Sequence, residues 1–226
     1  MNPAILYQSF GVVEGSYTDT GTDGTDATVF TFSAKSIGAA WSNRKIVVAV
    51  SGHSTSAART ISSVTVGGIA ATSVISATAG ANTNLAALYI ASVPTGITAN
   101  VVVTWSAGVG SCAVDLYRLV NAKTTANDTG SDITVGASNE EEATIYVPGG
   151  GFAIAAFTAD SSAGTRTTTW TNLTENTDRE TANDDSISFS SASLRYASSQ
   201  SALLITATAS GALSRGAFVC ASFGAP

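Results

Sequence analysis

The chain has 226 residues, of which 44% are hydrophobic and only 12% are charged. Hydrophobic content this high excludes intrinsic disorder, because a disordered chain combines low hydrophobicity with high net charge. Ten Lys and Arg residues stand against sixteen Asp and Glu residues, which gives a net charge of −6, so a nucleic-acid backbone would find little to bind. The length suits one large β domain or two small ones that share an interface.

An apolar leader opens the chain and contains Ile5, Leu6, Tyr7 and Phe10. It lacks the basic and apolar regions of a secretory signal, and no apolar run approaches the roughly 20 residues of a membrane span. We therefore expect a protein made in the cytoplasm without a signal peptide, with no membrane partner. Residues 17–26 are polar and rich in Gly, and we expect an exposed, mobile spacer there. Residues 1–26 are thus predicted to form an N-terminal arm or attachment segment.

The rest of the chain consists of short runs rich in Val, Ile, Thr and aromatic residues, separated by Gly, Asn, Asp or Ser, which is typical of β-strands. No segment carries an apolar stripe of helical period with caps. We therefore predict an all-β sandwich or jelly roll. The predicted strands cover residues 28–33, 45–51, 61–66, 70–76, 85–92, 100–106, 112–120, 143–147, 152–159, 167–173, 186–190, 193–196, 202–208 and 217–223.

The order of strands and loops in the first half recurs in the second half. Ile46 and Val64 match Phe152 and Trp170, about 106 positions downstream. Recurrence of this kind indicates two internally similar β modules. The Pro148 to Gly151 stretch is too short for a free linker, so we expect halves at 27–147 and 148–226 that pack together.

Cys112 and Cys220 both lie inside predicted strands. A cross-link between the halves is conceivable, but without a secretory signal we expect two buried free thiols.

The only histidine is His53, directly after a predicted central strand. A Ser-His-Asp triad would need this imidazole between a nucleophile and a carboxylate, and the chain has no Gly-x-Ser-x-Gly elbow. A histidine in a surface loop is the preferred interpretation. A cysteine nucleophile would also have to use His53, and the strand setting of both cysteines argues for burial instead.

Acidic residues gather in three places. Asp19, Asp23 and Asp26 have the spacing of a calcium loop, but Phe30 stands where an EF-hand needs its bidentate Glu, so a solvated acidic turn is favoured. The run 140–142 is predicted to be an exposed strand entrance, and residues 176–185 an exposed loop. Strand interiors offer almost no carboxylate for a glycosidase pair. We expect no metal and no cofactor.

Exposed aromatic side chains are candidates for ligand binding. Trp41, Tyr17 and Tyr196 could form a sugar-binding surface, whereas Trp105 and Trp170 lie in predicted strands and are expected in the core.

Four segments carry a resemblance to known proteins. They are residues 44–50 (RKIVVAV), 58–72 (ARTISSVTVGGIAAT), 93–96 (VPTG) and 170–175 (WTNLTE). Together with the strand pattern over residues 28–223, they resemble a group of β-sandwich proteins encoded in tailed-bacteriophage, prophage and gene-transfer-agent structural clusters. The resemblance implies a β-sandwich fold and a place in the virion, and its motifs have no catalytic content.

We therefore expect a non-enzymatic structural protein of a phage virion, namely a head decoration protein that binds neighbouring subunits of the major capsid protein. Its leader would dock on the shell or on a sister subunit, and unpaired sheet edges favour a homo-oligomer. The alternative is a carbohydrate- or receptor-binding module of a tail fibre or head spike that binds a host surface glycan. An enzyme acting on surface polysaccharide has no supporting residues.

Overall fold

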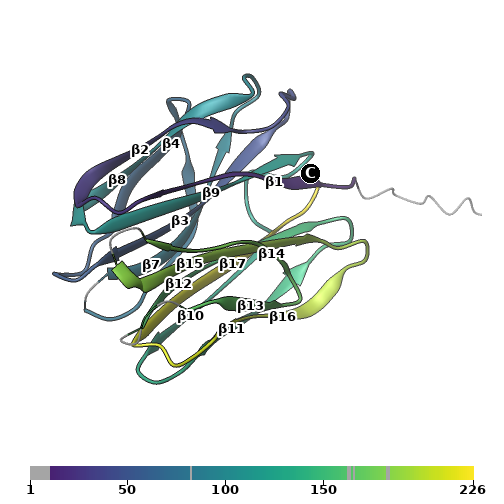
Figure 1. The fold of residues 1–226 in the computed structure, drawn as a ribbon. Helices are drawn as coiled ribbons and strands as arrows, with labels where there is room; N and C mark the ends of the chain where they lie inside the picture. Colours follow the sequence, from purple (N-terminus) through teal and green to yellow (C-terminus); the bar gives the residue numbers. More distant parts are fainter. Residues whose placement is uncertain (1–10, 82, 162–163, 165, 182–183) are drawn as a thin grey trace, which may run out of the picture.

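The computed structural model describes residues 11–81, 83–161, 164, 166–181 and 184–226. Within them the chain is all-β, as predicted, and forms four antiparallel sheets. The sheets lie on one another as four layers (Figure 1).

The first half of the fold supplies two sheets. Sheet A has the order β1 (Glu14–Asp23), β9 (Ser111–Val120), β3 (Lys45–Ser54), β7 (Thr83–Ser92) and β6 (Thr72–Thr78). Sheet B has the order β2 (Ala27–Ser36), β8 (Thr98–Val109), β4 (Ile61–Val66) and β5 (Ile69–Ala70). We call sheets A and B together the first sandwich.

The second half supplies the other two. Sheet C has the order β10 (Asp128–Val135), β17 (Arg215–Phe223), β12 (Phe152–Asp160), β15 (Asp184–Arg195) and β14 (Thr174–Thr181). Sheet D has the order β11 (Glu140–Val147), β16 (Gln200–Ala209) and β13 (Thr168–Thr171). Sheets C and D are the second sandwich.

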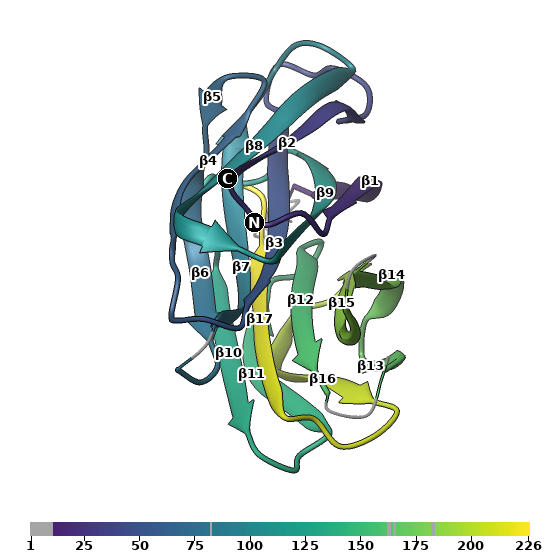
Figure 2. The ribbon, with the colours of Figure 1, turned by 60° about the vertical axis from the view of Figure 1, so that its left-hand side comes forward.

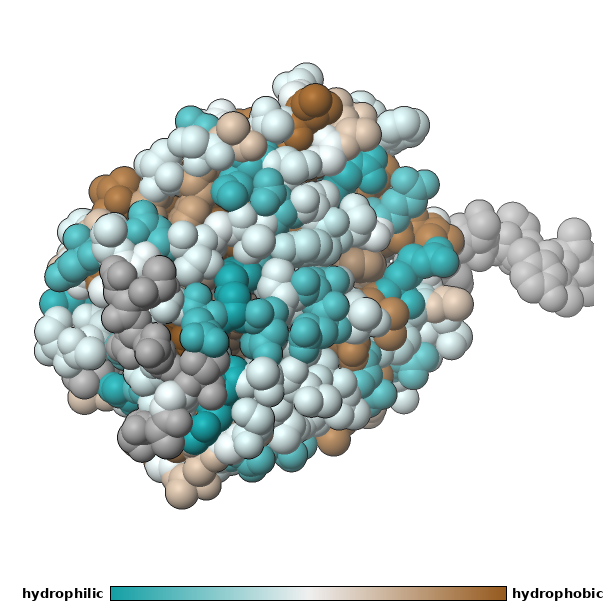
Figure 3. Space-filling view, viewed as in Figure 1, coloured by the Kyte–Doolittle hydropathy of each residue, from teal (hydrophilic) through white to brown (hydrophobic). Residues whose placement is uncertain are grey.

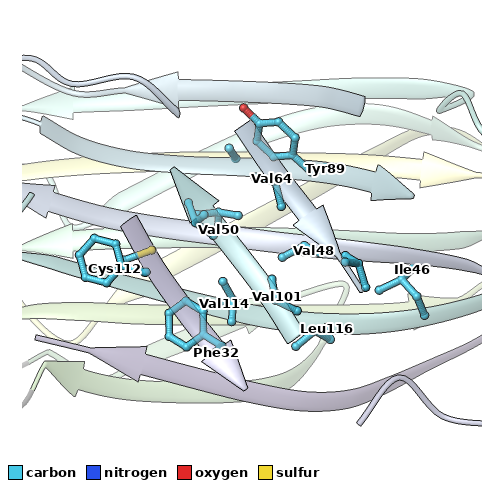
Figure 4. Packing of buried hydrophobic residues seen from close by; sticks show 14 of the residues in the cluster. Phe32, Ile46, Val48, Val50, Val64, Tyr89, Val101, Cys112, Val114 and Leu116 are labelled. Atoms are coloured by element: carbon cyan, nitrogen blue, oxygen red, sulfur yellow. The ribbon is translucent and has the colours of Figure 1, made fainter. Parts of the chain in front are cut away.

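Strand β3 shows why the sequence builds layers. Successive side chains of a strand point to opposite faces, and Ile46, Val48 and Val50 enter the core between sheets A and B (Figure 4). Val47 and Ala49 point the other way, against sheet C. A strand buried on both faces reads as a continuous apolar run, which is the pattern of this segment.

The two sandwiches pack back to back through sheets A and C. Leu88 and Tyr117 of sheet A meet Ile154, Val219 and Phe223 of sheet C in one buried cluster. Each fully buried aliphatic side chain contributes about 1.5–3 kcal/mol, so this inter-sandwich interface is a third core rather than a loose contact.

The strand orders of sheets A and C correspond one to one, with β1, β9, β3, β7 and β6 matched by β10, β17, β12, β15 and β14. The sheets are stacked in opposite senses, because β6 packs against β10 and β17 while β1 packs against β14 (Figure 2). Equivalent edges therefore lie on opposite sides of the molecule, as in an isologous dimer.

The passage between sandwiches lies at residues 121–127 rather than at Pro148 to Gly151. Strands β10 and β11 precede Pro148, yet they pair with β17 and β16 of the second sandwich. The sequence match of Ile46 with Phe152 also differs by one residue from the structural correspondence, in which Ala153 takes the place of Ile46. Ile46 points into the first sandwich, whereas Phe152 points into the inter-sandwich interface and Ala153 points into the second sandwich.

Two polar segments expected to be mobile loops contain strands. Most of the expected spacer at residues 17–26 belongs to β1, which pairs with β9. Most of the expected loop at residues 176–185 belongs to β14, which pairs with β15. Both are edge strands, and solvated edges accept polar residues.

Candidate functional site

The aromatic residues proposed for ligand binding are not brought together. Tyr17 of β1 is half-buried and lies edge-on to Tyr117, with ring centroids 5.7 Å apart. Tyr196 belongs to the second sandwich, and its hydroxyl donates a hydrogen bond to the carbonyl of Asn172. Both rings are thus committed to intramolecular contacts, and burial raises the pKa of each phenol.

Trp41 differs, because 57% of its surface is exposed in the connection between β2 and β3. Its carbonyl accepts a hydrogen bond from Arg44 N at 3.0 Å. Arg44 is fully buried and donates to the carbonyls of Ile37, Gly38, Val93 and Thr95 at 2.6–3.2 Å. The connection is therefore held in place, and it presents an exposed indole. Trp105 is buried in the first core, and Trp170 is half-buried with its Nε1 2.8 Å from Ser190 Oγ.

The leader residues Ile5, Leu6, Tyr7 and Phe10 lie outside the described residues.

His53 is not in a surface loop. It is the penultimate residue of β3, only 4% exposed, and it faces sheet C. Its Nε2 lies 3.9 Å from Asp160 Oδ2 on β12. Arg215 Nε on β17 donates to that same oxygen at 2.8 Å. No local sequence pattern indicates this cluster, because only the stacking of the second sandwich buries His53.

Ser111 is the cross-strand neighbour of His53, so a serine, a histidine and an aspartate do gather here. Their geometry differs from that of a triad. The distance of 3.9 Å between His53 and Asp160 exceeds hydrogen-bond reach, and Arg215 already occupies the carboxylate. The Ser111 side chain is buried as well. The group is a buried polar cluster in which the Asp160–Arg215 ion pair of sheet C lies beside His53 and Ser111 of sheet A.

An ion pair crosses the interface near β1. Arg179 Nη1 of β14 donates to Asp115 Oδ1 of β9 at 2.6 Å. Thr177 Oγ1 donates to the other carboxylate oxygen of Asp115 at 3.3 Å. Asp115 lies inside β9, and its role here is to bind the second sandwich to the first.

Glu141 departs from the prediction of an exposed strand entrance. Glu140 and Glu142 are exposed. Glu141, on the same strand β11, is fully buried, and its carboxylate lies against the backbone of Gly216 on β17. Neither of its carboxylate oxygens has a hydrogen-bond partner among the described residues. Burial, with a smaller effect from the charge of Asp132, raises the pKa of Glu141 to about 7.

The remaining candidates are satisfied locally. Asp23 Oδ1 accepts hydrogen bonds from Thr25 N and Oγ1 at 2.9 and 2.6 Å, as expected for an acidic turn. Among the described residues no cluster of three or more metal-ligating side chains occurs. Cys112 and Cys220 are buried free thiols in separate cores, and burial raises the pKa of each to about 12.

A groove runs along the side of the molecule where β6 passes over β10. It joins two hollows of about 230 and about 380 Å³ that share Thr72, Thr124 and Thr125. A register shift in β6 places Val74 at its wall. Of the residues that the structure describes, no charged side chain lines it. The other lining residues are Ser73, Ala126 and Thr129 in the first hollow and Ile69, Ala70, Ile90, Ala91 and Ser92 in the second.

No protein-family model, curated protein or solved structure matches the chain. Across the part that the structure describes, no helix has the length and apolar character to cross a membrane.

Proposed function

We propose that this chain is a non-enzymatic structural protein of a phage virion, a head decoration protein that binds neighbouring capsid subunits. The observation that supports it best is the outer face of sheet B. In β2, Val29 and Thr31 point outward between the buried Phe30 and Phe32. They lie beside Thr104 and Val102 of β8, which in turn neighbour Ser63 and Thr65 of β4.

These two cross-strand rows carry methyl and hydroxyl groups and no charge. A face without charge has a small desolvation cost on contact and binds by shape over a wide area. Three buried cores make the protein rigid, so little conformational entropy is lost when it binds a partner. The face seen in Figure 3 is likewise a mixture of hydrophilic and intermediate residues with scattered hydrophobic spots.

In this proposal the outer face of sheet B covers the capsid subunits, and the leader adds the attachment point. Its apolar residues Ile5, Leu6, Tyr7 and Phe10 would dock on the shell or on a sister subunit. Deletion of residues 1–26 would remove β1, so a test of the leader must stop before Glu14.

Immunogold electron microscopy of particles from the phage that encodes the protein tests the location. Regular label over the head supports the proposal, and particles without label overturn the virion assignment.

Co-sedimentation with heads that lack the protein tests the face. Thr31→Arg should abolish binding, because a guanidinium would be desolvated in the contact. Thr144→Arg is the matched control, since Thr144 is an exposed threonine on the outer face of sheet D. Equal binding by both variants would contradict the assignment of sheet B, provided both keep their β circular dichroism.

A receptor-binding module is the second candidate, favoured by the exposed and fixed Trp41. Aromatic faces bind sugar rings. Glycan-array binding that is lost in Trp41→Ala, together with label confined to the tail tip or spikes, would establish this function instead.

A further inference from the structure

The side of the molecule where β6 passes over β10 is incompletely covered. Ile133 of β10 pairs with Ala217, which is buried in the inter-sandwich interface, so both side chains share a face. Ile133 is nevertheless 50% exposed, and Val135 is 68% exposed. They are exposed because sheet A ends at β6, and among the described residues no further strand covers β10. The groove and these two residues form one continuous strip.

An edge strand such as β6 presents unpaired backbone groups to whatever lies beside it. The strip along β10 runs from Thr129, in the groove, to Val135. At about 3.3 Å per residue it is roughly 20 Å long. Its residues on β10 and in the groove are uncharged and mix hydroxyl and apolar groups, and Arg215, beside Val135, is bound to Asp160. The strip therefore suits an extended, uncharged, apolar segment.

We propose that the strip binds the leader of a second copy of this chain. Residues 4–10 are Ala-Ile-Leu-Tyr-Gln-Ser-Phe, which contain no charge. Extended, these seven residues measure about 23 Å, which matches the strip. The leader thereby supplies the segment that sheet A lacks over β10.

The position of Gly11 favours a second copy over the same copy. Asn121 Nδ2 donates to the carbonyl of Val12 at 3.1 Å, so the described chain begins beside the end of β9. Three strand positions separate β9 from β6 in sheet A, about 14 Å. Within one copy the last four leader residues would be used in crossing this distance, so Phe10 could not reach the strip and the seven-residue segment could not lie along its full length. A leader from a neighbour can place all of its apolar residues there.

Cross-linking in the full chain tests the inference. The native thiols Cys112 and Cys220 are buried with pKa values raised to about 12, so they should not react at neutral pH. Leu6→Cys protein is mixed with Thr125→Cys protein and treated with a short thiol-to-thiol cross-linker. We expect pairs of chains joined between the two cysteines. Leu6→Cys mixed with Thr144→Cys, on the outer face of sheet D, is the matched control and should give far fewer pairs.

The double variant Leu6→Cys with Thr125→Cys identifies the source of the leader. A cross-link formed within single chains, with none between chains in the mixture, would overturn the inference, and so would no cross-link in either sample. As a second readout, Ile133→Asp should weaken self-association about tenfold or more, measured by light scattering. Ile97→Asp, at another exposed isoleucine, should leave it unchanged.

The inference rests on the attachment role proposed for the leader, but the assay needs no virion. Cross-linking without label on particles would overturn the virion assignment alone. Label on heads without cross-linking would overturn the exchange of leaders alone.

Discussion

The two sides of the inter-sandwich interface occupy equivalent places in the strand order but are closed in different ways. On one side β1 packs on β14, and Arg179 reaches across to Asp115 while Tyr17 lies against Tyr117. On the other side β6 packs on β10, and the residues between them are threonines, alanines and aliphatics around an open groove. We call these the β1/β14 side and the β6/β10 side.

The difference shows that the strand order alone does not decide which edge of the interface is closed by residues of a single chain. A buried ion pair orients the two sheets, because its partners must meet in one geometry to offset their desolvation. A groove lined by hydroxyl and methyl groups imposes no such orientation and remains able to accept another segment. The molecule thus has one locked side and one receptive side.

Breaking the locked side should have the largest effect. Arg179→Met leaves the Asp115 carboxylate buried without its cation, which should lower the free energy of unfolding by about 3 kcal/mol. Urea unfolding followed by circular dichroism measures it.

Lys35→Met is the control for this prediction. Lys35 is 3.7 Å from Asp19, and both side chains are about a quarter exposed, so its loss should cost under about 1 kcal/mol. Similar losses in both variants would show that the Arg179 pair does not lock the interface.

Glu141, a residue whose ionisation depends on the fold, lies behind β10 on the receptive side. Glu141 contacts Gly216 of β17, which pairs with Thr134 of β10, between Ile133 and Val135. Its folded pKa of about 7 lies above the ordinary 4.5. The folded state therefore favours the protonated form, and stability falls as pH rises from about 4.5 to about 7, then stays level above that.

Glu141→Gln removes this ionisation. Relative to the unchanged chain it should gain about 3 kcal/mol of stability between pH 4.5 and pH 8. Thermal unfolding across that range is the measurement, with Glu142→Gln, an exposed neighbour, as the control. A difference that does not vary with pH would contradict the burial of an ionisable Glu141.

Sequence patterns predicted the strands whose burial is decided locally. The strand predicted at residues 100–106 is confirmed by β8, whose Val101, Val103 and Trp105 enter the first core. The strand predicted at residues 45–51 is confirmed by β3, whose apolar run from Ile46 to Val50 is buried on both faces. Edge strands β1 and β14 were missed because a solvated edge needs no apolar alternation, and Thr and Asp then resemble a loop.

The buried polar residues were missed for a different reason. His53 and Glu141 look like surface residues along the chain, and only the approach of β12 and of β17 buries them. The groove was equally invisible, because it arises where sheet A stops short of β10. Features made by the stacking of layers leave no local pattern in the sequence.

A smaller loss is expected at Asn84, which joins the sandwiches by hydrogen bonds alone. Asn84 is fully buried, and its Nδ2 donates to the carbonyls of Thr158 and Arg215 at 3.0 and 3.1 Å. Asn84→Ala should cost about 1–2 kcal/mol. Asn139 is an exposed residue, and Asn139→Ala removes its part-buried contact of 3.3 Å to a carbonyl within the second sandwich, which should cost about 0.5 kcal/mol or less. Equal costs would mean that Asn84 adds nothing across the interface.

The smallest effect on stability is expected on the receptive side itself. Ile133→Thr keeps a β-branched residue in β10 and removes apolar surface that is already half in water, so the free energy of unfolding should change by less than about 0.5 kcal/mol. Self-association should nevertheless weaken, because the lost surface is what a second copy would cover. Ile97→Thr should change neither quantity. If Ile133→Thr destabilised the isolated chain as much as Arg179→Met, the β6/β10 side would already be fully packed within one chain. The distinction between a locked and a receptive side would then be wrong.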